Sequence, residues 1–305
     1  MRQQWLSIQR GWGLIRALGW LQEQDTDLLI EEMANDLREL IGNLIKGRRE
    51  TYKTSSLLEH TFIHIPGIRP KTERHLWQQG ILTWGQYLHC KQAPFAPVRH
   101  AFVRQNLEDS LENRGNILFF RDRLSSADLW RLFDPFKDRA VYLDIETSGG
   151  CHGIDEITVI GLYDGHRVQT FVNGLNLNEF EIAIASYELL ITFNGSLFDL
   201  PVIGRHFPHI VLPPVHIDLR FFLRKLGYLG GLKAIEKTFF LSRASEIDGM
   251  NGYDAVKLWR AYLWGDQSAL ERLIQYNTAD IVHLKPLMET GYEEMKRRLL
   301  YTHDG

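Results

Sequence analysis

Carboxylate side chains stand in three short segments that lie far apart in the 305-residue sequence. Asp144 and Glu146 are two residues apart in AVYLDIE, Asp199 ends NGSLFD, and Asp280 ends YNTAD. Successive side chains of a strand point to opposite sides, so the first two carboxylates would share one side. Oxygen ligands without clustered Cys or His favour hard divalent cations such as Mg²⁺ or Mn²⁺. Convergence of the three segments would therefore create a site for divalent cations.

Each carboxylate, taken alone, also has an ordinary structural explanation. An Asp-x-Glu pair can simply end a half-buried strand with an exposed acidic edge. Ser196 and Asp199 have the spacing of a capping box at the start of a helix. Tyr276 and Asp280 lie four residues apart, a spacing that is common for surface pairs on helices. The prediction of a cation site therefore depends on the joint occurrence of the three segments.

Strand and helix patterns place these segments in a sheet with helices around it. AVYLDIE is a strand, and ITVIGLYDGHRVQTFV forms two strands joined at Asp164-Gly165, a dipeptide that suits a type I′ turn. A helix follows from about Asn176, then the strand ELLITF, a turn at Asn194-Gly195 and another helix. This order predicts three antiparallel strands extended by a parallel one, with helices on the faces of the sheet.

A long helix is predicted to begin near Ser268. Its apolar positions recur every three or four residues, with Tyr276 and Asp280 together on one margin of the inward stripe. The stripe consists of Leu270, Leu273, Asn277, Ile281, Leu284 and Met288. Both margin residues would therefore border a cleft rather than open solvent.

The three acidic segments carry a resemblance to a known superfamily. LDIET, FNGSLFD and YNTAD resemble, in order, the three exonuclease motifs of the DEDD superfamily in its tyrosine subtype. More narrowly, TFNGSLFDLPVI, VHIDLRF, LGGLKAIEK and AVKLWRAYLWGD are similar to segments of the YprB-type RNase H-like exonucleases. The resemblance covers most of residues 57 to 300. It implies an α/β fold with an RNase H-like mixed five-stranded sheet flanked by helices, and a smaller N-terminal helical region.

The resemblance also implies a reaction. The chain would be a 3′→5′ exonuclease that hydrolyses phosphodiester bonds of single-stranded DNA or RNA with two divalent cations, Mg²⁺ or Mn²⁺. Asp144 would bridge both cations, Glu146 and Asp280 would complete one site, and Asp199 would serve the other. Tyr276 would orient the attacking water.

Further residues are candidates for substrate binding in the same half of the chain. Asn194 could hydrogen-bond the substrate or the active site, and Asp218 stands in the segment HIDL. The turn at Gly231 and Lys233 could present backbone N–H groups and one ammonium to a phosphate, although it reads equally well as a glycine bend before a helix.

The segment LEHTFIHIPGIRPKTERHLW is similar to the N-terminal element of the YprB-type family and resembles a helix-hairpin-helix element. In such elements, backbone N–H groups of a glycine turn contact a nucleic-acid phosphate, which makes Arg69 and Lys71 candidate contacts. Arg69 stands where these hairpins usually have a second glycine. The alternative is a helical turn that only packs on the catalytic domain.

Three regions are expected along the chain: a helical extension and linker at 1–56, a helical module with the hairpin-like element at 57–138, and the exonuclease domain at 139–300. Two cysteines, Cys90 and Cys151, exclude a disulfide framework and fit a reducing compartment such as the cytoplasm. The apolar stretch from Trp12 to Leu21 is too short to span a bilayer. The formal charge of −3 decides nothing about nucleic acid, because catalytic carboxylates and basic patches can coexist.

Two other functions remain open. One is a structure-specific endonuclease of the RNase H-like fold, although such enzymes do not generally combine Asp-x-Glu with Tyr-x(3)-Asp. The other is a non-catalytic nucleic-acid-binding module, which clustered carboxylates disfavour because they repel phosphates without a metal. The histidine subtype is disfavoured because Gln275 stands where that histidine would be. A helicase or another repair or processing protein is the expected protein partner.

Overall fold

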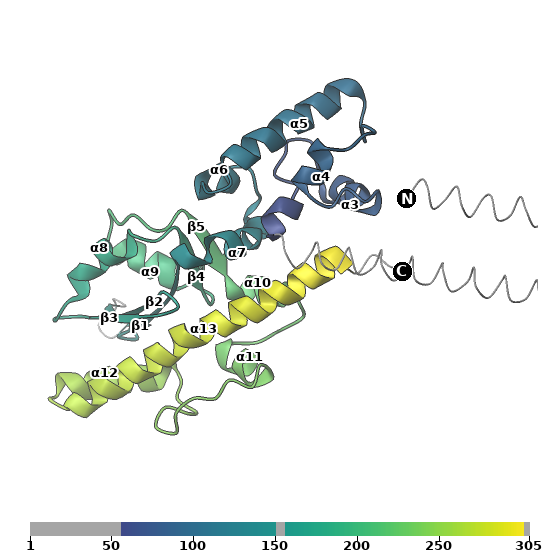
Figure 1. Ribbon diagram of the computed structural model, residues 1–305. Helices are drawn as coiled ribbons and strands as arrows, with labels where there is room; N and C mark the ends of the chain where they lie inside the picture. The colour runs from purple at the N-terminus through teal and green to yellow at the C-terminus, as the bar shows by residue number, and fades with distance from the viewer. Residues whose placement is uncertain (1–55, 151–155, 302–305) are drawn as a thin grey trace, which may run out of the picture. The chain divides into compact units, whose positions relative to one another are not determined.

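The computed structural model describes residues 56–150 and 156–301, and these form one compact unit (Figure 1). The helical extension and linker expected at 1–56 lie, except for Ser56, outside the described residues. None of the described helices combines the length and the low polarity that crossing a membrane requires.

The sheet has five strands in the order β3-β2-β1-β4-β5. β2 is antiparallel to β1 and β3, whereas β4 is parallel to β1 and β5 is parallel to β4. The strands are β1 Ala140–Thr147, β2 Ile157–Tyr163, β3 Val168–Val172, β4 Leu189–Thr192 and β5 Val215–Asp218. The predicted mixed five-stranded sheet is confirmed, and the C-terminal ends of β1, β4 and β5 lie at one edge.

The turn between β2 and β3 differs from the prediction. Tyr163 pairs with Val168, and the backbone N–H of Asp164 donates to the carbonyl of Arg167, so Gly165 and His166 are the two central turn residues. Only Gly165 has a positive φ, of 94°, whereas a type I′ turn needs positive φ at both central positions. The predicted type I′ turn at Asp164-Gly165 is therefore wrong by one residue. The Asp164 carboxylate instead accepts hydrogen bonds from the N–H groups of His166 and Arg167.

Helices cover both faces of the sheet. On one face, Val141, Leu143 and Ile145 of β1 pack with residues of α8 and α9 in one apolar cluster. On the other face, Val159 of β2 packs with residues of α12 and α13. The helical segments of this part are η5 Leu177–Glu179, α8 Phe180–Ile184, α9 Asp199–His206, α10 Leu219–Lys225, α11 Leu232–Thr238, α12 Gly252–Leu263 and α13 Gln267–Tyr301.

The long helix α13 runs beside the sheet and contacts β1 and β2 (Figure 1). Its apolar stripe forms as predicted. Buried on it are Leu270, Leu273, Asn277, Ile281, Leu284 and Met288. This packing fixes which side of α13 faces the acidic end of β1.

The residues before the sheet form short helical segments around a core that includes Trp84, Leu107 and Phe120. In the hairpin-like element, the segment before the Pro66-Gly67 turn is a 3₁₀ helix of only four residues. Later in this part of the chain, α5 extends over 16 residues. The elements are η1 Leu57–His60, α3 Pro70–Gln78, α4 Trp84–Leu88, α5 Pro97–Glu112, α6 Ile117–Arg121, η2 Ser126–Leu132, α7 Phe133–Phe136 and η3 Lys137–Arg139.

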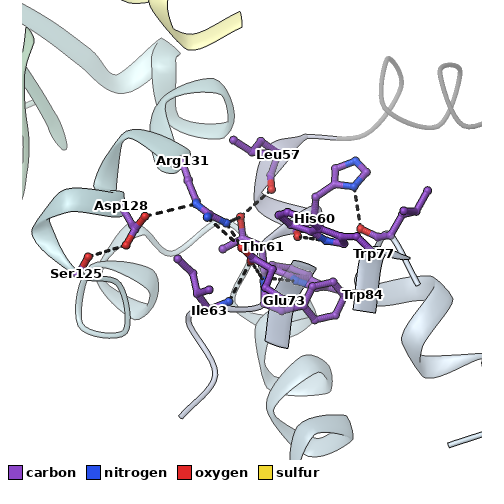
Figure 2. A network of polar contacts seen from close by, with 12 residues as sticks. Leu57, His60, Thr61, Ile63, Glu73, Trp77, Trp84, Ser125, Asp128 and Arg131 are labelled. Carbon is purple, nitrogen blue, oxygen red and sulfur yellow. Dashed lines mark hydrogen bonds and ion pairs between the residues drawn. The ribbon is translucent and has the colours of Figure 1, made fainter. Parts of the chain in front are cut away.

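A buried ion pair ties α3 to η2. The Arg131 guanidinium donates two parallel hydrogen bonds of 3.0 Å to the Glu73 carboxylate, and the two side chains are 3% and 1% exposed (Figure 2). Glu73 also accepts hydrogen bonds from the backbone N–H groups of Phe62 and Ile63. Glu73 follows the Pro66-Gly67 turn, whereas Phe62 and Ile63 precede it. Glu73 therefore joins both sides of the turn, and its ion pair with Arg131 fixes the hairpin-like element to η2.

Aromatic contacts then join η2 to the helices around the sheet. The Trp130 ring lies 5.7 Å from the ring of Phe222 in α10 and 5.9 Å from the ring of Tyr292 in α13, measured between centroids. η2 also contacts β5 directly. The hairpin-like element is thus anchored, through Arg131 and its neighbour Trp130, to the part of the chain that holds the carboxylates.

Candidate metal centre

Three of the predicted carboxylates converge at the end of β1. Asp144, Glu146 and Asp280 each offer an oxygen, and these oxygens lie within 4.8 Å of one another. Asp144 and Glu146 come from the side of β1 opposite to Val141, Leu143 and Ile145, and Asp280 comes from α13. The alternation of side chains along β1 and the apolar stripe of α13 together produce this convergence.

Asn277 fixes Asp144 in this position. Its side-chain amide donates to the carbonyl of Asp144 at 3.2 Å and to the Asp144 carboxylate at 3.0 Å. Gly161 of β2 pairs with Asp144, and a Cβ at Gly161 would stand only 2.1 Å from Oδ1 of Asn277. The close approach of α13 to the sheet therefore requires a glycine at this position.

Asp199, the first residue of α9, also contacts β1. It is 3% exposed, and its carboxylate accepts a hydrogen bond of 3.1 Å from the backbone N–H of Ile145, between Asp144 and Glu146. The capping-box alternative does not hold, because the N-cap of α9 is Phe198 without a side-chain capping bond. Asp199 is instead a buried carboxylate attached to the backbone of β1.

Burial raises the pKa values of these four carboxyl groups, and the negative charges of neighbouring carboxylates raise them further. Burial is the largest cause for each of Asp144 and Glu146, followed by the charges of Asp280 and Asp199. Burial also raises the pKa of Asp199 to about 7, against hydrogen bonds from backbone N–H groups. Burial raises the pKa of Asp280 as well, although Arg243 opposes it. Buried oxygen donors that repel one another fit a divalent cation, which would compensate their charge.

Arg243 supplies a positive charge at the edge of the cluster. Its guanidinium donates to the Asp280 carboxylate, and Nε and Nη2 donate to Glu236 at 2.9 and 2.6 Å. Glu236 of α11 also forms a 3.0 Å contact with Nδ1 of His283, which follows Asp280 by three residues on α13. The Arg243 side chain is 4% exposed, so this charge is withdrawn from solvent.

Tyr276 and Lys233 lie together beside the cluster. The Lys233 ammonium donates to the Tyr276 hydroxyl at 2.9 Å and lies 4.6 Å from the centre of its ring. Burial and the nearby charges of Asp280 and Glu146 raise the pKa of Tyr276, which keeps its O–H as a neutral hydrogen-bond donor. The predicted tyrosine and the predicted lysine are thus both next to the acidic residues.

Asp218 and Asn194 form a neighbouring structure at the ends of β4 and β5. The Asp218 carboxylate accepts hydrogen bonds from the backbone N–H groups of Asn194, Ser196 and Arg220, at 2.8, 3.0 and 3.1 Å. Asn194 adopts a positive φ of 68°, and its side-chain oxygen accepts from Arg220. Asp218 therefore braces the turn that leads into Asp199.

Arg69 and Lys71 lie apart from the carboxylates, and Gly231 only precedes Lys233. Arg69 is the N-cap residue of α3 and Lys71 lies in its first turn, and α3 is well separated from β1 in Figure 1. Gly231 is the N-cap residue of α11, two residues before Lys233. Within the described residues, no hydrogen bond or ion pair joins Arg69 or Lys71 to the carboxylates, so their role in substrate binding stays a prediction.

Two contacts at this site were not predicted from the sequence. Asn277 was placed on the inward stripe without a function, and only the pairing of Asp144 with Gly161 exposes its role. Glu236 stands in LGGLKAIEK and Arg243 seven residues later, and neither residue type nor spacing there indicates an ion pair with Asp280.

One comparison with known protein families bears on this topology. The family model described as RNase_H superfamily matches residues 141–292. Together with the sheet order, the match gives this part of the chain an RNase H-like fold. A search of curated proteins found no significant match.

Several solved structures are similar at low identity. A family B DNA polymerase from the archaeon Pyrobaculum calidifontis matches with 15% identity and a TM-score of 0.41, covering 50% of this chain and 24% of the polymerase. Brucella melitensis NrnC with bound Mg²⁺ matches with 20% identity and a TM-score of 0.38, covering 55% and 79%. Escherichia coli RNase D, an exoribonuclease, matches with 19% identity and a TM-score of 0.35, covering 58% and 48%. This chain thus spans about a quarter of the polymerase.

Proposed function

Because residues 141–292 have an RNase H-like fold, we propose that this chain is a divalent-cation-dependent nuclease that removes nucleotides from the 3′ end of single-stranded nucleic acid. The observation that carries the proposal is the convergence of Asp144, Glu146 and Asp280, with oxygens within 4.8 Å of one another. The 3′→5′ direction and the tyrosine subtype are supported by the motifs LDIET, FNGSLFD and YNTAD.

The four carboxylates divide between two sides of the reacting phosphate in this proposal. Asp144, Glu146 and Asp280 would hold one cation, and Asp199 with Asp144 would hold a second. Two Mg²⁺ or Mn²⁺ ions bound there would supply an activated water and would stabilise charge on the leaving oxygen. Asn277 keeps the Asp144 carboxylate in place through its 3.0 Å hydrogen bond.

Tyr276 and Lys233 act on the substrate side of the same centre. The Tyr276 hydroxyl keeps its proton and donates a hydrogen bond that orients the attacking water. Lys233, which contacts this hydroxyl at 2.9 Å, fixes its direction and adds a positive charge for the phosphate. Both contributions are positional and electrostatic, so neither residue has to remove a proton.

The test is a digestion series with 5′-labelled single-stranded DNA and RNA, in Mn²⁺, in Mg²⁺ and in EDTA. The wild-type protein should shorten the labelled strands stepwise from the 3′ end in the presence of either cation. Asp144→Asn should lose at least about 100-fold in rate because it removes a ligand charge. Asp138→Asn is the matched control, since Asp138 is exposed and lies six residues earlier in the chain.

Three outcomes would contradict the proposal or part of it. Equal activity of Asp144→Asn and wild type would exclude the carboxylate centre as the source of hydrolysis. Rapid cleavage of closed circular single strands would favour the structure-specific endonuclease. Tight binding with no hydrolysis under any cation condition would favour the non-catalytic binding module.

A further inference from the structure

A cavity of about 660 Å³ lies between the residues that connect the helical elements to the sheet and the β5–α10 segment. One wall comes from α6 and η2, with Arg121 and Trp130. The other wall comes from the end of β5 and from α10, with Asp218, Phe221 and Lys225. Its volume is in the range of cavities that hold small organic ligands.

The lining combines an exposed aromatic ring with two positive charges. Phe221 is 42% exposed although it is a large apolar side chain, and it lines the cavity together with the buried Trp130. Arg121 is 38% exposed and forms an ion pair with its neighbour Asp122. Lys225 donates to the carbonyl of Ala127 across the cavity. An aromatic face with nearby cations is the combination that binds successive nucleotides of a single strand.

The acidic residue in the lining does not oppose this ligand strongly. Asp218 accepts three hydrogen bonds from backbone N–H groups, and its side chain is 9% exposed. Its charge is therefore compensated and withdrawn from the cavity. Ser196, an exposed residue of the lining, can donate a hydrogen bond to a phosphate oxygen.

One turn of the chain connects the lining of the cavity to the candidate metal centre. Ser196 lines the cavity and Asp199, three residues later, contacts the backbone of β1 between Asp144 and Glu146. β1, β4 and β5 are parallel, so their C-terminal ends and the residues after them lie along one edge of the sheet. Ligands of open α/β sheets bind along such an edge.

We propose that this cavity binds a nucleotide of the same single strand whose 3′ end lies at the carboxylates, with its base against Phe221 and its phosphate near Arg121. The proposal rests on the proposed nuclease function for the identity of the strand. It predicts that the cavity contributes only to strands long enough to extend from the metal centre across the Asn194–Asp199 turn. A dinucleotide would not reach it.

The experiment measures binding separately from hydrolysis. Fluorescence polarisation in Mn²⁺ uses the Asp144→Asn protein as background, with labelled 12-nucleotide dT and rU strands and labelled dinucleotides as probes. Adding Phe221→Ala should weaken binding of the 12-nucleotide strands at least fivefold and change dinucleotide binding less than twofold. Adding Arg121→Glu should act in the same direction. The DNA and RNA arms distinguish the two kinds of strand.

Phe102→Ala in α5 is the matched control, because Phe102 is 48% exposed and lies outside the cavity. The inference is overturned if Phe221→Ala and Arg121→Glu bind the long strands as tightly as the background protein does. It is also overturned if they weaken the dinucleotide equally. A digestion assay on wild type runs in parallel. Length-dependent loss of binding without any hydrolysis in wild type would support the cavity and reject the nuclease.

Discussion

Arg243 and Asp280 form a buried ion pair at the edge of the candidate metal centre. Arg243 comes from the segment between α11 and α12, whereas Asp280 is one of the three carboxylates whose oxygens lie within 4.8 Å of one another. The guanidinium thus already compensates part of the negative charge that a divalent cation would compensate. Arg243 and a bound cation compete for the same carboxylate.

The competition predicts that Arg243→Met binds Mn²⁺ more tightly than wild type. The positive charge of Arg243 a few ångströms from a divalent cation in a partly buried site costs several kcal/mol of repulsion before the site relaxes. Because relaxation removes most of this energy, we expect the dissociation constant of Mn²⁺ to fall only roughly tenfold. Isothermal titration calorimetry with Mn²⁺ measures the dissociation constant directly. The same variant should melt at a lower temperature in EDTA, because Asp280 and Glu236 then lack a counter-charge.

Arg104→Met is the control for Arg243→Met. It makes the same substitution in an exposed pair, since Arg104 and Glu108 are 47% and 44% exposed. Its Mn²⁺ affinity should equal that of wild type. Weaker binding by Arg243→Met would instead mean that the arginine serves mainly to orient Asp280.

Gly161→Ala tests the contact between Asn277 and Asp144. A methyl group at Gly161 would stand 2.1 Å from Oδ1 of Asn277, so the amide must move and Asp144 loses its hydrogen bond. Loss of such an orienting partner typically lowers metal affinity or activity by roughly 10- to 100-fold. Mn²⁺ titration and the digestion assay measure the two effects.

Gly204→Ala provides the comparison for Gly161→Ala. Gly204 lies in α9 with no atom within 4 Å of an added Cβ, so alanine should leave activity unchanged and stabilise the helix slightly. Equal behaviour of the two variants would show that Asn277 adapts without cost and that its hydrogen bond to Asp144 is dispensable.

Sequence patterns sufficed for the elements that carry the carboxylates. The alternation in AVYLDIE put Asp144 and Glu146 on one side of β1, and the stripe of α13 faced Asp280 toward them, because strand and helix periods constrain side chains directly. The contacts of Arg243 and Glu236 depend on the path of an irregular segment, which no period describes. The predicted position of the β2–β3 turn was wrong by one residue for a related reason. The pairing between the two strands determines which two residues lie at the centre of the turn.

The ion pair between Arg131 and Glu73 is expected to be essential for the stability of the helical elements. Arg131→Met leaves a carboxylate that is 1% exposed without its partner, which typically costs about 3–5 kcal/mol. Urea unfolding followed by tryptophan fluorescence measures the loss, because Trp77 and Trp84 lie near the pair in Figure 2 and the Trp130 ring lies 5.9 Å from the Arg131 guanidinium. Arg104→Met should cost less than about 1 kcal/mol, as exposed pairs do. A similar cost for both variants would mean that Glu73 finds compensation in its backbone donors alone.

Because His64 is buried, we expect the protein to lose stability in mild acid. Burial lowers its pKa from 6.5 to about 3, and its Nε2 lies 2.8 Å from the hydroxyl of Ser110. A group whose folded pKa is depressed stabilises the fold above its unfolded pKa, and this contribution is lost as the pH falls from about 6.5 toward 3. Over that window the unfolding free energy of wild type should fall by up to about 1.4 kcal/mol per pH unit relative to His64→Phe, which has no proton to bind. The carboxylate cluster titrates in both proteins, so the difference between their urea unfolding curves in EDTA isolates His64. A difference that stays constant from pH 7 to pH 4 would mean that His64 is protonated in the folded chain as readily as in the unfolded one.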